Sequence, residues 1–255
     1  MKKILPILLA GTLLGGCVAN KPAQVELTVF AAASLTEPMT EIAELYSAEH
    51  PNVTIEFNFD SSGTLKTQIE EGAVCDLFLS AGQKQMNELD VVLEESRTDL
   101  LENQVTLCVP AGNPANVTGF DDLAARLADG SVFLAMGNAD VPVGQYTQKI
   151  LTYYGLEEEA LAAAGVLTYG TNVKEVTTQI AEGAVNCGVI YSTDAFSAGL
   201  TIVDTATAEM CGQVIYPAAV LETSTHSKEA QEFLDYLRTD DAAAVFEAVG
   251  FKVLA

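Results

Sequence analysis

Short apolar runs alternate with segments of helical periodicity along most of the chain. Residues 25–32 form an apolar run typical of a strand, and apolar positions then recur near helical spacing at Met39, Ile42 and Tyr46, which predicts a helix over about 35–49. Residues 53–59 alternate as a second strand, and a helix through Glu71 is expected to stop at Gly72. This alternation of strand and helix favours an α/β fold with mostly parallel sheets.

The same unit recurs further along the chain. Apolar strands are expected at 76–80, 132–136 and 187–190, helices are expected to open at Pro142 and near Asn172, and one or two helices are expected over 227–249. The stretch 68–75 is echoed by 179–187, each copy giving a helix, a glycine stop and a strand. This echo fits either two related lobes or the common form of any αβ unit.

Several of these strands run into small polar residues that open a helix. Ser34 follows the first strand and, with Glu37 three residues later, forms a capping-box pattern, while Ser62 or Thr64 can cap the next helix. A helix N-terminus carries free backbone N–H groups and partial positive charge. Several such ends that converge would bind an anion without lysine or arginine.

Composition narrows the class of partner. The chain has 255 residues, 49% of them hydrophobic and 18% charged, as expected for a compact globular protein rather than a disordered one. Its formal net charge of −23 argues against nucleic acid and anionic lipid head groups. Small anions remain compatible, because salt screens surface carboxylates beyond a Debye length of about 8 Å.

The N-terminus is typical of an exported protein. Lys2 and Lys3 precede an apolar run over 4–14 that is too short to span a bilayer as a mature helix. Residues 14–17, Leu-Gly-Gly-Cys, resemble the bacterial lipobox, which implies a signal peptide over 1–16, lipidation of Cys17 and a polar tether over 17–24. We therefore expect a protein anchored by lipid on the extracytoplasmic face of the cell membrane.

Four cysteines remain after the lipobox. They allow three pairings if two disulfides form, and their apolar neighbours fit buried free thiols equally well. No CxxC motif or Cys/His cluster suggests a metal site. They are Cys75, Cys108, Cys187 and Cys211.

The sequence gives little support to an enzymatic function. The chain has two histidines and no GxSxG, HExxH, Walker or GxGxxG motif, and its paired carboxylates are typical of solvated helix faces. A function in anion binding explains more of the sequence. A dianion that is buried in a protein needs hydrogen bonds in place of its water shell, and the polar residues that open the helices can supply them. Each bond to a charged group contributes about 1.5–3 kcal/mol, so five or six neutral donors suffice for micromolar affinity.

Four segments together resemble the periplasmic molybdate-binding proteins of ABC importers. They are VFAAASLTEPM (29–39), FDSSGTLKTQIEEGAVCDLFLSAGQKQM (59–86), VPVGQY (141–146) and GVIYSTDA (188–195), and the resemblance runs from about Leu27 to the C-terminus. It implies a two-lobed type II periplasmic binding protein fold of the Venus-flytrap kind, with a hinge between lobe 1 (25–104 and 214–255) and lobe 2 (105–213).

The resemblance also implies a ligand, a set of contacts and a partner. The ligand would be molybdate, and tungstate with it, delivered by a monomeric receptor to the permease of an ABC transporter, with no cofactor and no direct metal-ion ligands. Two serines, a tyrosine hydroxyl and main-chain N–H groups hold the oxyanion in this family. The matching positions are Ser34, Ser62, Ala81, Val143, Val173 and Tyr191.

This chain departs from the family pattern at two positions. Asp60 stands where a small or hydroxyl residue is commoner, and Gly63 replaces a third serine. Because successive strand residues alternate faces, we expect Asp60 to point away from the site. An inward Asp60 would instead accept a proton from hydrogen phosphate.

Other functions stay open at this stage. The chain could be a receptor for another oxyanion such as phosphate or sulfate, a secreted hydrolase that uses Ser62 or Ser192 without an evident base, or a surface lipoprotein without a ligand.

Overall fold

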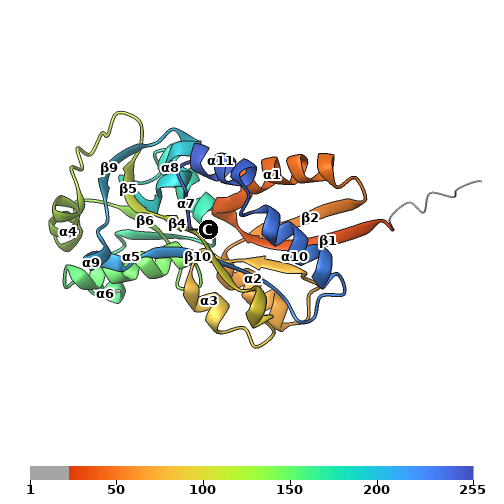
Figure 1. Ribbon diagram of the computed structural model, residues 1–255. Coiled ribbons are helices and arrows are strands. Elements are labelled where there is room, and N and C mark those ends of the chain that lie inside the picture. Colours follow the sequence, from red (N-terminus) through yellow and green to blue (C-terminus); the bar gives the residue numbers. More distant parts are fainter. Residues whose placement is uncertain (1–22, 255) are drawn as a thin grey trace, which may run out of the picture.

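The chain folds around two mixed β-sheets that lie side by side along its length (Figure 1). The structure is a computed structural model and describes residues 23–254. The expected signal peptide, the lipidation site Cys17 and the tether as far as residue 22 lie outside the described residues. No helix within 23–254 is long and apolar enough to cross a bilayer.

The six-stranded sheet draws its strands from both ends of the described chain. Its order is β11-β4-β10-β3-β1-β2, with β1 parallel to β2 and β3, and with β10 antiparallel to β3 and β4. The strands are β1 (Val25–Ala32), β2 (Val53–Asp60), β3 (Leu77–Leu79), β4 (Thr98–Asn103), β10 (Val214–Val220) and β11 (Lys252–Val253).

The five-stranded sheet comes from one continuous stretch. Its order is β7-β6-β8-β5-β9, with β6 parallel to β7 and β8, and with β5 antiparallel to β8 and β9. The strands are β5 (Val105–Val109), β6 (Leu134–Gly137), β7 (Leu167–Gly170), β8 (Cys187–Tyr191) and β9 (Thr201–Thr205).

Helices follow most of the parallel strands, as the periodicity predicts. The helices around the first sheet are α1 (Thr36–Glu49), α2 (Ser62–Glu70), α3 (Gln83–Asn87), α10 (Ser227–Tyr236) and α11 (Asp240–Ala248), with the 3-10 turns η1 (Ala33–Leu35) and η2 (Glu94–Ser96). Those around the second sheet are α4 (Phe120–Ala128), α5 (Pro142–Tyr153), α6 (Glu158–Ala163), α7 (Val173–Ala181), α8 (Ser192–Ala198) and α9 (Ala208–Cys211).

The chain passes between the sheets twice, and these crossings change the predicted topology. The first joins β4 to β5 through Gln104, and the second joins β9 to β10 through α9. The strands next to the crossings, β4, β5, β9 and β10, make the antiparallel pairs. The two-lobed α/β fold is therefore confirmed, but the sheets are mixed rather than mostly parallel, because a strand entering from the other sheet has no βαβ crossover to set its direction.

The packing accounts for two of the predicted local features. Met39, Ile42 and Tyr46 bury one face of α1, and the ring of Tyr46 meets Phe233 of α10 edge to face at 4.9 Å between centroids. Gly72 ends the segment of α2 with φ of +91°, a conformation that side chains disfavour.

Cys75, Cys108, Cys187 and Cys211 are all free and buried, so none of the three pairings forms.

Candidate anion-binding site

One small cavity lies where residues from both sheets meet. The cavity volume there is about 10 Å³, far less than the roughly 300–1,000 Å³ of sites for drug-sized ligands. Such a space suits a small inorganic ion. It is lined by Ala32, Ala33, Ser34, Asp60, Ser61, Ser62, Ala81, Val141, Pro142, Val173 and Tyr191.

The structure brings five of the six predicted contacts to this cavity. Ser34, Ser62 and Ala81 come from the first sheet, and Val173 and Tyr191 from the second. Val143, the sixth, is the second residue of α5 and follows the lining residue Pro142. Val143 is buried but is not among the residues that line the cavity.

Ser62 lies at the start of α2, but it does not cap the helix. The cap is Ser61, whose Oγ accepts a hydrogen bond from the N–H of Thr64 at 3.1 Å, so the expectation of Ser62 or Thr64 as the cap is wrong. Ser62 Oγ instead accepts from the N–H of Ala81 at 2.9 Å. Its own O–H is thereby left to donate elsewhere.

The capping box predicted for Ser34 and Glu37 is also wrong. Ser34 lies within η1, and neither η1 nor α1 has a side-chain cap. Its Oγ lies 2.9 Å from Oη of Tyr216 on β10, and both side chains are buried. The tight 3-10 turn places Ser34 inside the helical segment rather than before it, which directs its side chain inward.

Two helix N-termini of the second sheet approach the same cavity. Pro142 occupies the first turn of α5, as predicted. Gly144 lets this turn pack on the end of β6, because a Cβ there would lie 2.3 Å from the carbonyl oxygen of Gly137. Asn172 caps α7, its side chain accepting from the N–H of Glu175 at 3.1 Å. The first N–H groups of both helices are left without intrahelical acceptors.

Tyr191 ends β8 and is fully buried at the cavity. Its ring packs edge to face on Tyr216 at 5.7 Å and on Tyr146 at 6.5 Å between centroids. Burial raises the pKa of Tyr191 well above 10, so the hydroxyl keeps its proton. Its oxygen has no hydrogen-bond partner among the described residues. A buried hydroxyl that lacks a partner costs about 1–3 kcal/mol, which a ligand oxygen would offset.

Asp60 lines the cavity, contrary to the expectation that it points away. It is the last residue of β2, where strand alternation gives way to the turn into α2. Its Oδ1 accepts from the N–H of Ser61 at 2.7 Å and lies 3.4 Å from Nδ2 of Asn172. The carboxylate is thus held by donors from both sheets.

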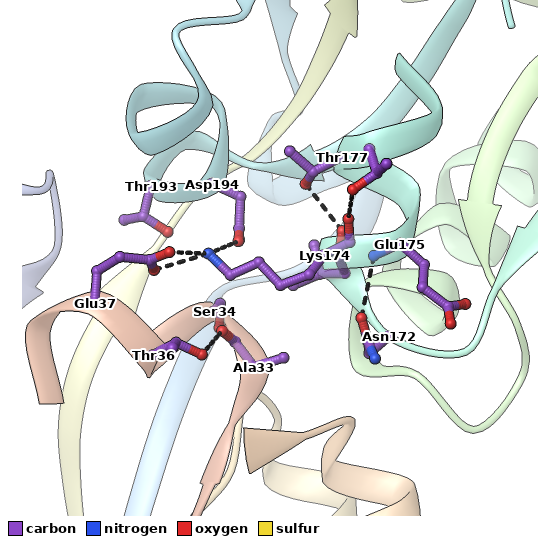
Figure 2. Close-up of polar contacts among 12 residues, drawn as sticks. Ala33, Ser34, Thr36, Glu37, Asn172, Lys174, Glu175, Thr177, Thr193 and Asp194 are labelled. Carbon is purple, nitrogen blue, oxygen red and sulfur yellow. Dashed lines mark hydrogen bonds and ion pairs between the residues drawn. The ribbon is translucent and has the colours of Figure 1, made fainter. Parts of the chain in front are cut away.

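A cluster of charged side chains beside the cavity links the two sheets (Figure 2). Nζ of Lys174 on α7 lies 2.8 Å from Oε2 of Glu37 on α1 and 3.2 Å from Oδ1 of Asp194 on α8. The side chain of Asp194 is fully buried, whereas that of Glu37 is 49% exposed. Lys174 therefore bridges α1 and α8 through its amino group.

Burial and charge compete in this cluster. Burial raises the pKa of Asp194 to about 6, although Lys174 opposes the shift. For Lys174, burial alone would lower the pKa, but the carboxylates of Asp194 and Glu37 outweigh it and raise the pKa. No motif in the sequence marks this cluster. Its only local signal is the position of Lys174 directly after Val173, a predicted contact.

Other close contacts join the two sides of the cavity. Gly63, at the start of α2, faces the loop before α5, and a Cβ on it would lie 2.1 Å from the carbonyl oxygen of Asp140. Nε2 of Gln85 donates to Oε1 of Gln145 at 3.2 Å, which ties α3 to α5. The glycine that replaces a serine of the family pattern thus allows backbone to approach backbone here.

The site offers an anion neutral donors rather than cations. The cavity-lining residues, all within 23–254, include no lysine or arginine. In the same part of the chain, His, Cys, Asp and Glu form no group of three that could hold a metal ion. Hydroxyl and backbone donors in a small cavity match the chemistry of a tetrahedral oxyanion.

Comparison with known proteins places the chain among transport receptors. The family model of the bacterial extracellular solute-binding protein matches residues 27–252. A Bacillus subtilis (strain 168) protein named "Putative ABC transporter substrate-binding lipoprotein YvgL" is 36% identical, over 96% of this chain and 95% of its own length. Molybdate-binding protein ModA of Haemophilus influenzae is 32% identical, over 99% of each chain.

A solved structure agrees on the fold. The periplasmic molybdate-binding protein of Azotobacter vinelandii superposes with a TM-score of 0.77, covering 90% of this chain and all of its own, at 21% identity. The matched family consists of binding proteins, which rules out the alternative of a secreted serine hydrolase. The chain belongs to the bacterial extracellular solute-binding proteins.

Proposed function

We propose that this protein captures molybdate, and tungstate with it, in the cavity between its two sheets and delivers it to the permease of an ABC transporter. The observation that carries the proposal is that three hydroxyl-bearing residues, Ser34, Ser62 and Tyr191, line one small cavity whose lining includes no lysine or arginine. The names of the Haemophilus and Azotobacter proteins favour molybdate over other oxyanions.

The donors divide by type and by origin. Ser34 and Ser62 would donate from the first sheet, and Tyr191 would supply a third hydroxyl from the second. The N–H groups of Val143 and Val173, at the openings of α5 and α7, would complete the shell together with Ala81. Ala81 already donates to Ser62 Oγ, so it would act partly through that serine.

Closure follows from this division of donors. The proposed lobe 1 comprises 25–104 and 214–255, and lobe 2 comprises 105–213, with hinges at the two chain crossings. A ligand that takes donors from both lobes stabilises the closed form by its differential affinity for it. The receptor would work as a monomer on the extracytoplasmic face, held by lipid on Cys17, and the lipoprotein name of the Bacillus relative supports this anchoring.

Isothermal titration calorimetry with molybdate, tungstate, sulfate and phosphate tests the ligand. We expect micromolar or tighter binding of molybdate and tungstate, which share charge and shape, and weaker binding of the smaller sulfate ion. Binding of sulfate or phosphate in the absence of molybdate binding would refute the proposal.

Two serine variants test the site. Ser34→Ala and Ser62→Ala each remove one donor to a buried charge, so each is expected to raise the Kd for molybdate by about tenfold to a hundredfold. Ser131→Ala, at an exposed position outside the cavity, serves as the control. Unchanged affinity in both cavity variants, with the fold retained, would move the site elsewhere.

Asp60 supports a second candidate, a receptor for hydrogen phosphate. Its carboxylate lines the cavity, where it would accept the proton of a monoprotonated oxyanion. This candidate predicts phosphate affinity that depends on pH and that is lost in Asp60→Asn. Molybdate carries no such proton near neutral pH, so in the same variant its affinity should rise as the negative charge is removed.

A further inference from the structure

A chain of buried polar groups connects the candidate site to the first crossing between the sheets. Oγ of Ser34 lies 2.9 Å from Oη of Tyr216, and Nδ2 of Asn103 lies 3.2 Å from the same Oη. Asn103 ends β4 and precedes the crossing residue Gln104. Ser34, Tyr216 and Asn103 are at least 95% buried, so water does not compete for these bonds.

The amide of Asn103 has only one orientation that satisfies its neighbours. Its Oδ1 accepts from the backbone N–H of Gln104 at 2.8 Å, and a backbone N–H can only donate. The hydroxyl of Ser192 donates to the same oxygen at 3.0 Å. Nδ2 must therefore face the hydroxyl groups of Tyr216 and Thr193, and it donates to both.

This orientation favours one direction for the next bond. Because Tyr216 Oη accepts from Asn103, its single proton is free to donate to Ser34 Oγ, which lies 2.9 Å away. Burial raises the pKa of Tyr216 well above 10, so the proton is retained near neutral pH. With Tyr216 as the donor, Ser34 receives this hydrogen bond and its own O–H is left to point toward the cavity.

Ser62 shows the same arrangement by another route. Its Oγ accepts from the N–H of Ala81 at 2.9 Å, which again leaves the hydroxyl proton free for the cavity. Both cavity serines thus have their oxygen occupied by a fixed donor from behind. A hydroxyl that accepts one hydrogen bond becomes a better donor of the next.

We propose that Tyr216, oriented by Asn103, is a positioning residue that holds Ser34 as a hydrogen-bond donor to the anion. This role rests on the proposed function, and it adds a residue that does not line the cavity. Without the phenol, the hydroxyl of Ser34 loses its fixed donor and rotates among other acceptors, so fewer molecules present a proton to the ligand.

A double-mutant cycle tests this role by calorimetry, with whichever of molybdate, tungstate, sulfate and phosphate the wild-type protein binds. Tyr216→Phe is expected to raise the Kd by about fivefold to tenfold, the size of one neutral hydrogen bond. In a Ser34→Ala background the same change is expected to alter the Kd by less than about twofold, because no hydroxyl remains to orient. Tyr46→Phe removes another buried phenol oxygen far from the cavity and serves as the matched control.

The outcomes separate the two hypotheses. If Tyr216→Phe weakens binding equally with and without the Ser34 hydroxyl, the effect comes from packing and the positioning role is wrong. An unchanged Kd in the wild-type background overturns it as well. Failure of the wild-type protein to bind any of the four anions refutes the proposed function itself, and with it the role of Tyr216.

Discussion

Replacing Lys174 with Met tests the electrostatics of the cluster in Figure 2. The substitution removes the positive charge between Glu37 and Asp194 but retains an unbranched apolar side chain for packing. Asp194 then has no cation beside it, and its side chain has no access to water. Its simplest response is to keep its proton, so we expect the cost of Lys174→Met to depend on pH.

The magnitude follows from the pKa of Asp194, which burial raises from 3.8 to about 6. A carboxyl with a raised pKa stabilises the folded state below about pH 4 and loses that contribution as pH rises through 6. At pH 7, one unit above this pKa, the ionised form of Asp194 beside Lys174 lies about 1 kcal/mol below its protonated form. Lys174→Met removes that advantage.

The half-exposed pair with Glu37 adds about 0.2–1 kcal/mol to the cost. The total is therefore about 2 kcal/mol at pH 7, about 3 kcal/mol at pH 8 and below about 1 kcal/mol at pH 5, where Asp194 is protonated with or without the lysine.

Urea unfolding followed by circular dichroism at pH 5, 7 and 8 measures these costs. Lys228→Met is the matched control, because Lys228 lies 3.1 Å from Glu232 in a pair whose side chains are 79% and 47% exposed. It should leave the free energy of unfolding almost unchanged at each pH. A cost for Lys174→Met that stays constant from pH 5 to pH 8, or that is larger at pH 5, would refute the reasoning.

Three further predictions concern closure, the thiols and a helix cap. Gly63→Ala should keep α2 and the loop before α5 from approaching each other, because its Cβ would come within 2.1 Å of the Asp140 carbonyl oxygen. Calorimetry should then show weaker oxyanion binding, with the far-ultraviolet circular dichroism spectrum unchanged. The four described cysteines should stay unreactive to a thiol reagent in the native protein and react in denaturant, because burial raises the pKa of Cys75 and Cys187 to about 12. Asn172→Ala should lower the free energy of unfolding by about 1 kcal/mol through loss of the α7 cap, measured by urea titration.

The positions of the strand-to-helix junctions could be predicted from the sequence, whereas the roles of single hydroxyl groups could not. Periodicity and local turn chemistry place the openings of α2, α5 and α7 within a residue or two. Ser61 and Ser62 are adjacent and chemically identical, so only the backbone path decides which one caps α2 and which one faces the cavity.

Contacts across the two sheets were beyond prediction for a different reason. Lys174 and Glu37 are 137 positions apart, so their pairing depends on how the two sheets sit together. Ser34 and Tyr216 both belong to the six-stranded sheet but are 182 positions apart, so their pairing depends on where β10 enters that sheet. Local periodicity carries no information on that arrangement. The antiparallel strands next to the crossings were missed for the same reason.

The sheet order also sets the sequence of folding events. The five-stranded sheet comes from one continuous stretch, whereas β10 lies between β4 and β3 at the middle of the six-stranded sheet and follows them by more than 100 positions in the chain. Distant pairings of this kind form slowly, because a long loop must close before any contact stabilises it. During synthesis, which proceeds from the N-terminus, the six-stranded sheet that carries Ser34 and Ser62 begins to form first and is completed last. Its exposed strands then require protection from misassociation until β10 arrives.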